Sequence, residues 1–177
     1  MNKIIYISLL MFAFMCKSYQ NSPLNKYVLQ KVDLKKYTGK WFEIERFPHS
    51  FEKHLKCVTA EYSLLEDNKI MVINSGYNIE NPKEFESAEG IAYVPDQNIQ
   101  GKIKVSFFRP FYGNYWILHL EENYNYALIG DPTLNYLWIL ARKPDLEEKN
   151  IQMLKEKAKE MGFDISRLKK VPHDCSN

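Results

Sequence analysis

The segment Tyr37-Thr38-Gly39-Lys40-Trp41-Phe42-Glu43-Ile44 opens the part of the chain that is rich in aromatic and β-branched residues. Such a run, continued over 39–47, predicts a β-strand. Successive side chains of a strand point to opposite faces, so Glu43 is expected to face the same way as Trp41. A carboxylate on the buried face needs hydrogen-bond partners or a proton.

From this segment to Arg142 the chain consists of short runs of Tyr, Phe, Val, Ile and Trp, separated by turn residues. Val58, Ala60 and Tyr62, for example, alternate with polar residues, which is the period of a half-buried strand. Eight strands are predicted, over 39–47, 58–64, 69–77, 88–94, 103–107, 115–120, 124–129 and 135–142. No helix-length segment interrupts them, which excludes a parallel α/β fold and leaves an all-β sandwich or barrel.

The C-terminal part has a different period. After Pro144-Asp145, apolar residues recur mostly at spacings of three, four or seven up to Met161, and Gly162 follows as a stop signal. This pattern predicts one amphipathic helix packed on the outside of the sheet.

The N-terminus resembles a secretory signal. Lys3 precedes a short apolar run over 4–15, too short to span a membrane, and Cys16 follows it. We therefore divide the chain into a signal peptide over 1–18, or one ending before Cys16, an N-terminal extension over 19–36 and a folded domain over 37–177.

Export makes disulfides possible, and a Cys57–Cys175 bond would fasten the tail to the domain. Cys16 is then left over. One interpretation is that Cys16 is acylated, as in a bacterial lipoprotein, although Phe14 and Met15 replace the usual small residues. The other is cleavage after Ser18, which discards Cys16.

Composition and motifs exclude several classes of function. The net charge of +2 comes without a block of Lys and Arg interleaved with aromatics, so nucleic acid is not an expected partner. The histidines show no metal-ligand spacing, and no Gly-x-Ser-x-Gly elbow is present. We expect no enzyme activity, no metal and no cofactor. A haem would require an inward histidine, and His119 is expected to face outward.

Two distant motifs fit together. Gly39-Lys40-Trp41 begins the first predicted strand, and Arg142 ends the last one in Leu137-Trp138-Ile139-Leu140-Ala141-Arg142. This resembles the lipocalin family, whose signature is Gly-x-Trp on the first strand and Arg after the eighth. Four blocks, at 37–44, 57–64, 105–113 and 136–142, extend the likeness over 31–175, within the branch of bacterial outer-membrane lipocalins and apolipoprotein D. Asn135 departs from the Asp usual in the family.

The resemblance implies an eight-stranded antiparallel up-and-down barrel with one C-terminal helix outside. Arg142 would pack across Trp41 and, with Gly39, close one end. It also implies a lipid-like ligand, a fatty acid or lysophospholipid, carried without chemistry. The side chains expected to line the cavity are Glu43, Ala60, Tyr62, Gly90, Ala92, Val105, Phe107, Trp116 and Leu118. Trp116 matches a pocket tryptophan implied by the resemblance. Glu43 has two interpretations: a structural contact to tyrosine or backbone groups, or a limit on how deep a lipid tail reaches.

Two questions stay open. A barrel filled by its own side chains would be a structural or protein-interaction domain without a lipid ligand. The predicted aromatic loop at 110–113 fits the cavity entrance, a membrane or a second subunit equally well, so a homodimer is compatible with the sequence. The expected location is the outer membrane if Cys16 is acylated, and the periplasm or the medium if Cys16 is removed.

Overall fold

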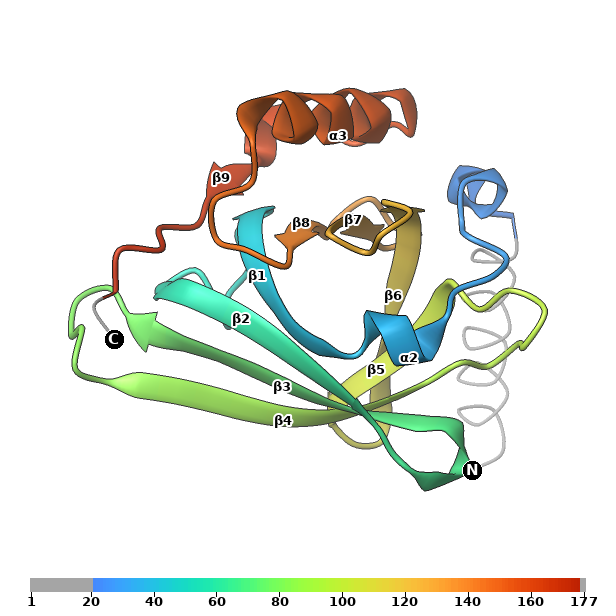
Figure 1. The fold of residues 1–177 in the computed structure, drawn as a ribbon, viewed down its shortest axis with the longest axis horizontal. Coiled ribbons are helices and arrows are strands. Elements are labelled where there is room, and N and C mark those ends of the chain that lie inside the picture. Colours follow the sequence, from blue (N-terminus) through green and yellow to red (C-terminus); the bar gives the residue numbers. More distant parts are fainter. Residues whose placement is uncertain (1–20, 176–177) are drawn as a thin grey trace, which may run out of the picture.

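Eight antiparallel strands close into a barrel in the computed structural model, which describes residues 21–175 (Figure 1). Each strand pairs with the next, and β1 pairs with both β2 and β8, which completes the circle. The predicted fold class is confirmed. The strands are β1 Gly39–Arg46, β2 Leu55–Leu64, β3 Lys69–Asn78, β4 Phe85–Tyr93, β5 Lys102–Phe108, β6 Phe111–Leu120, β7 Tyr126–Gly130 and β8 Leu137–Ala141.

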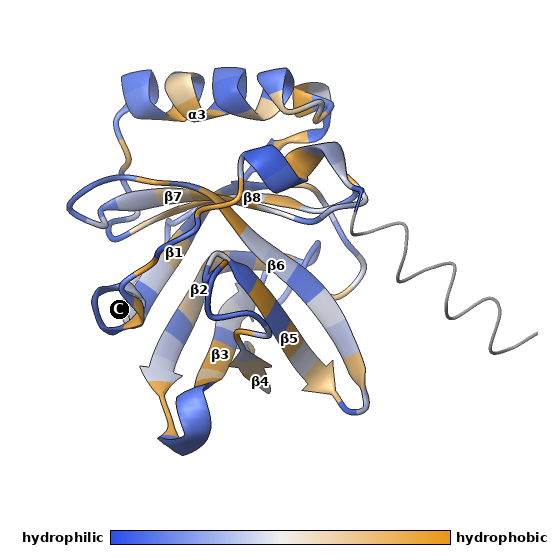
Figure 2. Ribbon diagram, turned by 90° about the vertical axis from the view of Figure 1, so that its right-hand side faces the viewer, coloured by the Kyte–Doolittle hydropathy of each residue, from blue (hydrophilic) through white to orange (hydrophobic). Residues whose placement is uncertain are grey.

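The predicted C-terminal helix is α3, Glu148–Glu160, and it lies against the barrel beside β7 and β8 (Figures 1 and 2). Its apolar stripe, Ile151, Leu154 and Ala158, is buried. Gly162 follows it with φ +96°, a conformation that side chains with a Cβ rarely adopt. Beyond the short 3₁₀ turn η3, Ile165–Arg167, the strand β9, Lys169–Lys170, pairs with β1; the sequence did not predict this strand.

The segment before the first strand packs along the barrel. It contains the 3₁₀ turn η1, Pro23–Lys26, and the short helix α2, Leu34–Tyr37; another 3₁₀ turn, η2, Glu66–Asn68, joins β2 to β3. Leu24, Val28 and Val32 are buried, so most of the predicted extension 19–36 belongs to the folded body. The predicted signal and Cys16 lie outside the described residues. No helix in the described part of the chain is long and apolar enough to cross a membrane.

Buried apolar side chains form two main layers. The inner layer fills part of the barrel and includes Trp41, Ala60, Tyr62, Val72, Ile117 and Leu140. The outer layer lies between the barrel wall, α3 and the N-terminal segment and includes Leu24, Phe47, Trp116, Leu118, Leu154 and Phe163. The wall under α3 is therefore buried on both faces.

This double burial explains an error in the predicted side-chain directions. Trp116 and Leu118 belong to the outer layer and Ile117 to the inner one, opposite to the prediction. The sequence Tyr115-Trp116-Ile117-Leu118 has no polar face, because a strand covered on both sides needs none, so alternation could not distinguish inside from outside. A bulge follows, since Ile117 pairs with Ile129 but His119 with Leu128. Burial, and then the positive charge of Lys157 in α3, lower the pKa of His119, so its side chain lies on the outer face toward α3.

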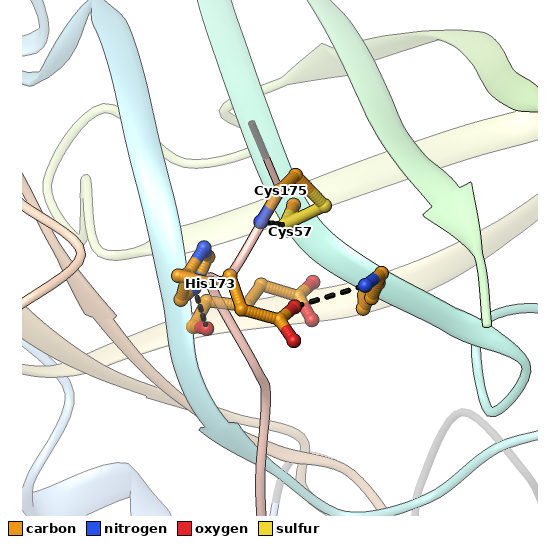
Figure 3. Close-up of a disulfide and its surroundings, with 6 residues drawn as sticks. Cys57, His173 and Cys175 are labelled. Carbon is orange, nitrogen blue, oxygen red and sulfur yellow. Dashed lines mark hydrogen bonds and ion pairs between the residues drawn. A yellow bond between two sulfur atoms is a disulfide. The ribbon is translucent and has the colours of Figure 1, made fainter. Parts of the chain in front are cut away.

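The tail is bonded to the barrel wall by the predicted disulfide. Cys57 on β2 and Cys175 are linked, with 6.3 Å between their Cα atoms (Figure 3). Cys57 lies in a bulge of β2, where the register shifts between Lys56 and Thr59, and it has φ +52°. His173 Nε2 lies 2.8 Å from the carbonyl oxygen of Glu43, so the tail also contacts β1 (Figure 3).

Candidate functional site: a cavity open at one end of the barrel

One end of the barrel is closed by Arg142 and Trp41. The guanidinium carbon of Arg142 lies 4.0 Å from the centre of the Trp41 ring. Arg142 also donates hydrogen bonds to the carbonyl oxygens of Lys40, at 3.0 Å, and Lys36, at 2.7 Å. Gly39 begins β1 with φ +89°. These three predicted closure residues, Gly39, Trp41 and Arg142, thus lie together at the end where the chain enters β1.

A cavity of about 510 Å³ occupies the barrel above this plug. Such a volume lies within the usual range of small-molecule sites, roughly 300–1,000 Å³. Its apolar wall comes from strands on all sides and includes Ala60, Ile70, Val72, Ala92, Ile103, Val105, Trp138 and Leu140. The β1–β2 and β7–β8 connections also line it, through Phe51 and Thr133, as does Phe111 at the start of β6, so the cavity opens at the end opposite Trp41. We call that end the mouth.

Six of the predicted cavity residues line this space: Glu43, Ala60, Tyr62, Ala92, Val105 and Phe107. Trp116 and Leu118 do not, because they lie in the outer layer described above. Gly90 is covered by the ring of Phe107, whose Cδ1 would lie 2.9 Å from a Cβ at that position. A larger residue at Gly90 would therefore displace a wall of the cavity.

Three tyrosines share hydrogen bonds near the closed end. The hydroxyl oxygens of Tyr37 and Tyr115 are 2.6 Å apart, and Tyr62 donates to Tyr115 at 2.9 Å. Tyr37 also packs on Trp41, with ring centres 4.9 Å apart. Burial raises the pKa of all three phenols above the ordinary value of 10.0, so they remain protonated. Sequence reasoning missed Tyr37 and Tyr115, because their meeting depends on contacts between distant segments.

Glu43 belongs to a charged cluster in the wall. Its Oε2 accepts a hydrogen bond from Arg46 Nη1 at 2.8 Å, and Arg46 also donates to the carbonyl oxygens of Glu52 and Leu55. Asn74 Nδ2 donates to Glu52 Oε1 at 3.0 Å. His49 Nε2 lies 3.1 Å from Glu52 Oε2, within ion-pair range but not aligned for a hydrogen bond.

The two carboxyl groups of this cluster titrate differently. Burial, and then repulsion by Glu52, raises the pKa of Glu43 well above its ordinary value of 4.5. Burial also acts to raise the pKa of Glu52, but His49, Arg46 and the hydrogen bond from Asn74 outweigh it and lower that pKa. Glu43 therefore holds a proton more readily than Glu52 does.

Among the described residues, the cavity lining carries acids but no bases. Its carboxyl groups are Glu43, Glu52 and Asp131, and none of the described residues that line it is Lys, Arg or His. Asp131 has a structural role, because its carboxylate accepts hydrogen bonds from the backbone N–H groups of Thr133, Asn135 and Tyr136. As lined by residues 21–175, the deep part of the cavity thus offers apolar contacts and phenol hydroxyls but no cation.

A closed barrel with one open end and a single-molecule cavity defines the class of β-barrel proteins that hold small ligands. Comparison with known proteins gives the family. The model of the lipocalin-like domain matches residues 32–173. The chain belongs to the lipocalin family.

Its relatives include bacterial and animal proteins. Outer membrane lipoprotein Blc of Vibrio cholerae is 41% identical over 162 residues, which cover 89% of this chain and 94% of that protein. Apolipoprotein D of Mus musculus is 33% identical, with 93% and 92% covered. Among solved structures, insecticyanin from the tobacco hornworm superposes with a TM-score of 0.65 at 26% identity, covering 82% of this chain and 83% of that one.

Proposed function

We propose that the protein reversibly binds one lipid-like molecule with a single long chain in the barrel cavity and performs no chemistry on it. The observation that carries the proposal is the apolar cavity of about 510 Å³, open at the mouth and closed by Trp41 and Arg142. Each methylene group moved from water into such a cavity contributes roughly 0.8 kcal/mol. The affinity then comes mainly from the apolar chain, which suits a carrier that must release its ligand.

The charges of the lining support one orientation of the ligand. An anionic head placed deep in the cavity would meet apolar side chains and the protonated phenols of Tyr37, Tyr62 and Tyr115, without a basic partner among the described lining residues. The ligand's tail should therefore lie inward and its polar head at the mouth. A fatty acid and a lysophospholipid both satisfy this arrangement, and we propose these two classes as ligands.

The relatives support a location. Proteins of V. cholerae and Escherichia coli, the latter 40% identical over 156 residues, are named outer membrane lipoproteins. We propose that this chain is likewise exported, acylated at Cys16 and held at the outer membrane. Cleavage after Ser18 would instead leave the protein in the periplasm or the medium. A homodimer is compatible with either form.

The test is native mass spectrometry of the protein as purified from cells, followed by extraction of bound lipid. The wild type is expected to carry a fatty acid or lysophospholipid, and Ala92→Phe, which fills the cavity, should lose it. Trp116→Phe is the matched control, because Trp116 is as deeply buried as Ala92 but lies outside the cavity. The control should keep the lipid.

Thermal melting gives a second measurement. A ligand at one hundred times its dissociation constant stabilises the folded state by about 2.7 kcal/mol, which raises the melting temperature. A protein that is empty after purification and does not shift with any added lipid would favour the filled-barrel, protein-interaction alternative.

A further inference from the structure

The hairpin that joins β5 and β6 exposes two stacked aromatic side chains. Phe108 is 77% exposed and Phe111 is 72% exposed. Their rings are almost parallel, at 5°, with centres 6.4 Å apart. Figure 2 shows the hydrophobic colour at both strand ends of this hairpin, separated by a polar turn. Exposed apolar patches of this kind usually mark a binding surface.

This surface is continuous with the ligand cavity. Phe111 and Tyr112 of the hairpin line the cavity, as does Phe51 from the β1–β2 loop, which is 62% exposed. The aromatic rim formed by Phe51, Phe108, Phe111 and Tyr112 therefore reaches from the outer surface into the binding site. A ligand that leaves the cavity at this rim passes over aromatic side chains.

The N-terminal segment begins close to the same rim. The hydroxyl of Ser22 donates a hydrogen bond, 3.4 Å long, to the carbonyl oxygen of Pro132. Pro132 lies in the β7–β8 loop between Asp131 and Thr133, which both line the cavity. Cys16 is six residues before Ser22. Six residues span at most about 20 Å when fully extended, so a lipid on Cys16 must enter a membrane within that distance of the Pro132 loop.

We propose that the mouth faces the membrane that holds the protein, and that the aromatic rim inserts among its lipid head groups. This inference rests on the proposed function, lipid carriage with a Cys16 anchor. Phenylalanine side chains at the boundary between head groups and acyl chains bury apolar area there. With the rim in the membrane, a lipid tail would move between bilayer and cavity without crossing water, the step in which its apolar surface is most unfavourably exposed.

The experiment places a tryptophan at the rim in the protein as purified from cells. Phe108→Trp is mixed with phosphatidylethanolamine–phosphatidylglycerol vesicles that carry bromine on their acyl chains, a contact quencher of tryptophan. Leu65→Trp is the matched control, because Leu65 is 38% exposed in the turn at the closed end. Wild-type protein gives the background of Trp41, Trp116 and Trp138.

The added fluorescence of Phe108→Trp is expected to shift to shorter wavelengths and to be quenched at least about two-fold more than that of Leu65→Trp. Equal quenching of the two variants, or stronger quenching of Leu65→Trp, would overturn the proposed orientation. The mass spectrometry above is independent of this result, because it reports bound lipid whichever way the mouth faces.

A serine variant separates membrane contact from contact between two copies. Phe108→Ser, at an exposed ring that does not line the cavity, should keep its co-purified lipid but exchange it with vesicles several-fold more slowly than the wild type. Sedimentation velocity without vesicles gives the competing outcome. A wild-type dimer that Phe108→Ser converts to monomer, with no quenching of Phe108→Trp, would assign the rim to a second copy and overturn the proposal.

Discussion

The guanidinium of Arg142 covers the indole of Trp41, with 4.0 Å between the guanidinium carbon and the ring centre. Arg142 follows the last barrel strand and Trp41 lies in the first, so this contact joins the two ends of the barrel sequence. Trp41 is completely buried, and its indole N–H donates to the carbonyl oxygen of Tyr37 at 2.8 Å. This end of the barrel is thus closed by the indole of Trp41, which contacts Arg142 through its face and Tyr37 through its N–H group.

Replacing Arg142 by Ala should destabilise the protein by about 2–4 kcal/mol. The variant loses a half-buried cation–π contact, worth about 1–2 kcal/mol, and hydrogen bonds to three backbone carbonyls. Urea unfolding measures the change, and Arg142→Lys should recover only part of it, because Lys lacks the planar fork. Lys143→Ala is the control, and a loss no larger than in this control would contradict the assigned role.

Glu43→Gln and Glu52→Gln should change stability with opposite dependence on pH. The pKa of Glu43 is raised in the folded state, so ionising it opposes folding as the pH rises above about 4.5. The pKa of Glu52 is lowered, so its ionised form stabilises the fold above that pH and the contribution disappears as the pH falls.

Between about pH 4 and pH 7 the stability of Glu43→Gln relative to wild type should therefore rise, and that of Glu52→Gln should fall. Urea midpoints at several pH values test both variants under identical conditions. Parallel curves for the two variants would show that the two carboxyl groups do not differ as described.

Gly130→Ala should destabilise the protein by about 1–3 kcal/mol through overpacking. A Cβ at Gly130 would lie 2.6 Å from Phe163 Cζ and 2.9 Å from Leu118 Cδ1, in the outer layer between β7 and the segment after α3. Gly113→Ala is the matched control on a neighbouring strand, because a Cβ there would lie 3.8 Å from the carbonyl oxygen of Val105, an ordinary contact. Thermal or urea unfolding of both variants gives the comparison, and equal losses would argue against tight packing at Gly130.

Removing the disulfide by Cys57→Ser with Cys175→Ser should lower the unfolding free energy by about 4–5 kcal/mol in the chain-entropy model. The bond closes a loop between residues 118 positions apart. The expected result is a lower urea midpoint for the double variant and for wild type treated with reductant. A midpoint unchanged by either treatment would mean that the tail contacts, such as those of Val171, hold without the bond.

Much of the barrel was predictable from local patterns. The strand carrying Ala60 and Tyr62 has one face to the cavity and one to the outside, so its alternation identified these two inward residues. The strand carrying Trp116 was different, because Leu24 and α3 cover its outer face and both faces became apolar. The bulge after Ile117 also interrupts the alternation of inward and outward side chains, and the spacing of apolar residues does not predict a bulge.

The sequence by itself predicted eight strands and an outer helix from local periods, and the Cys57–Cys175 bond from the cysteine positions and the expected export. The barrel and the Trp41–Arg142 closure followed from the resemblance to the lipocalin family, whose motif has a fixed chemistry. Only the tertiary structure decided that Trp116 lies outside the cavity, that three tyrosine hydroxyls meet near the closed end, and that Glu43 pairs with Arg46. The physical reason is that each of these features depends on how side chains pack in space, and the local sequence around a residue does not identify what will pack against it. Burial, hydrogen bonding and the pKa of a carboxyl group depend on what packs against it in space.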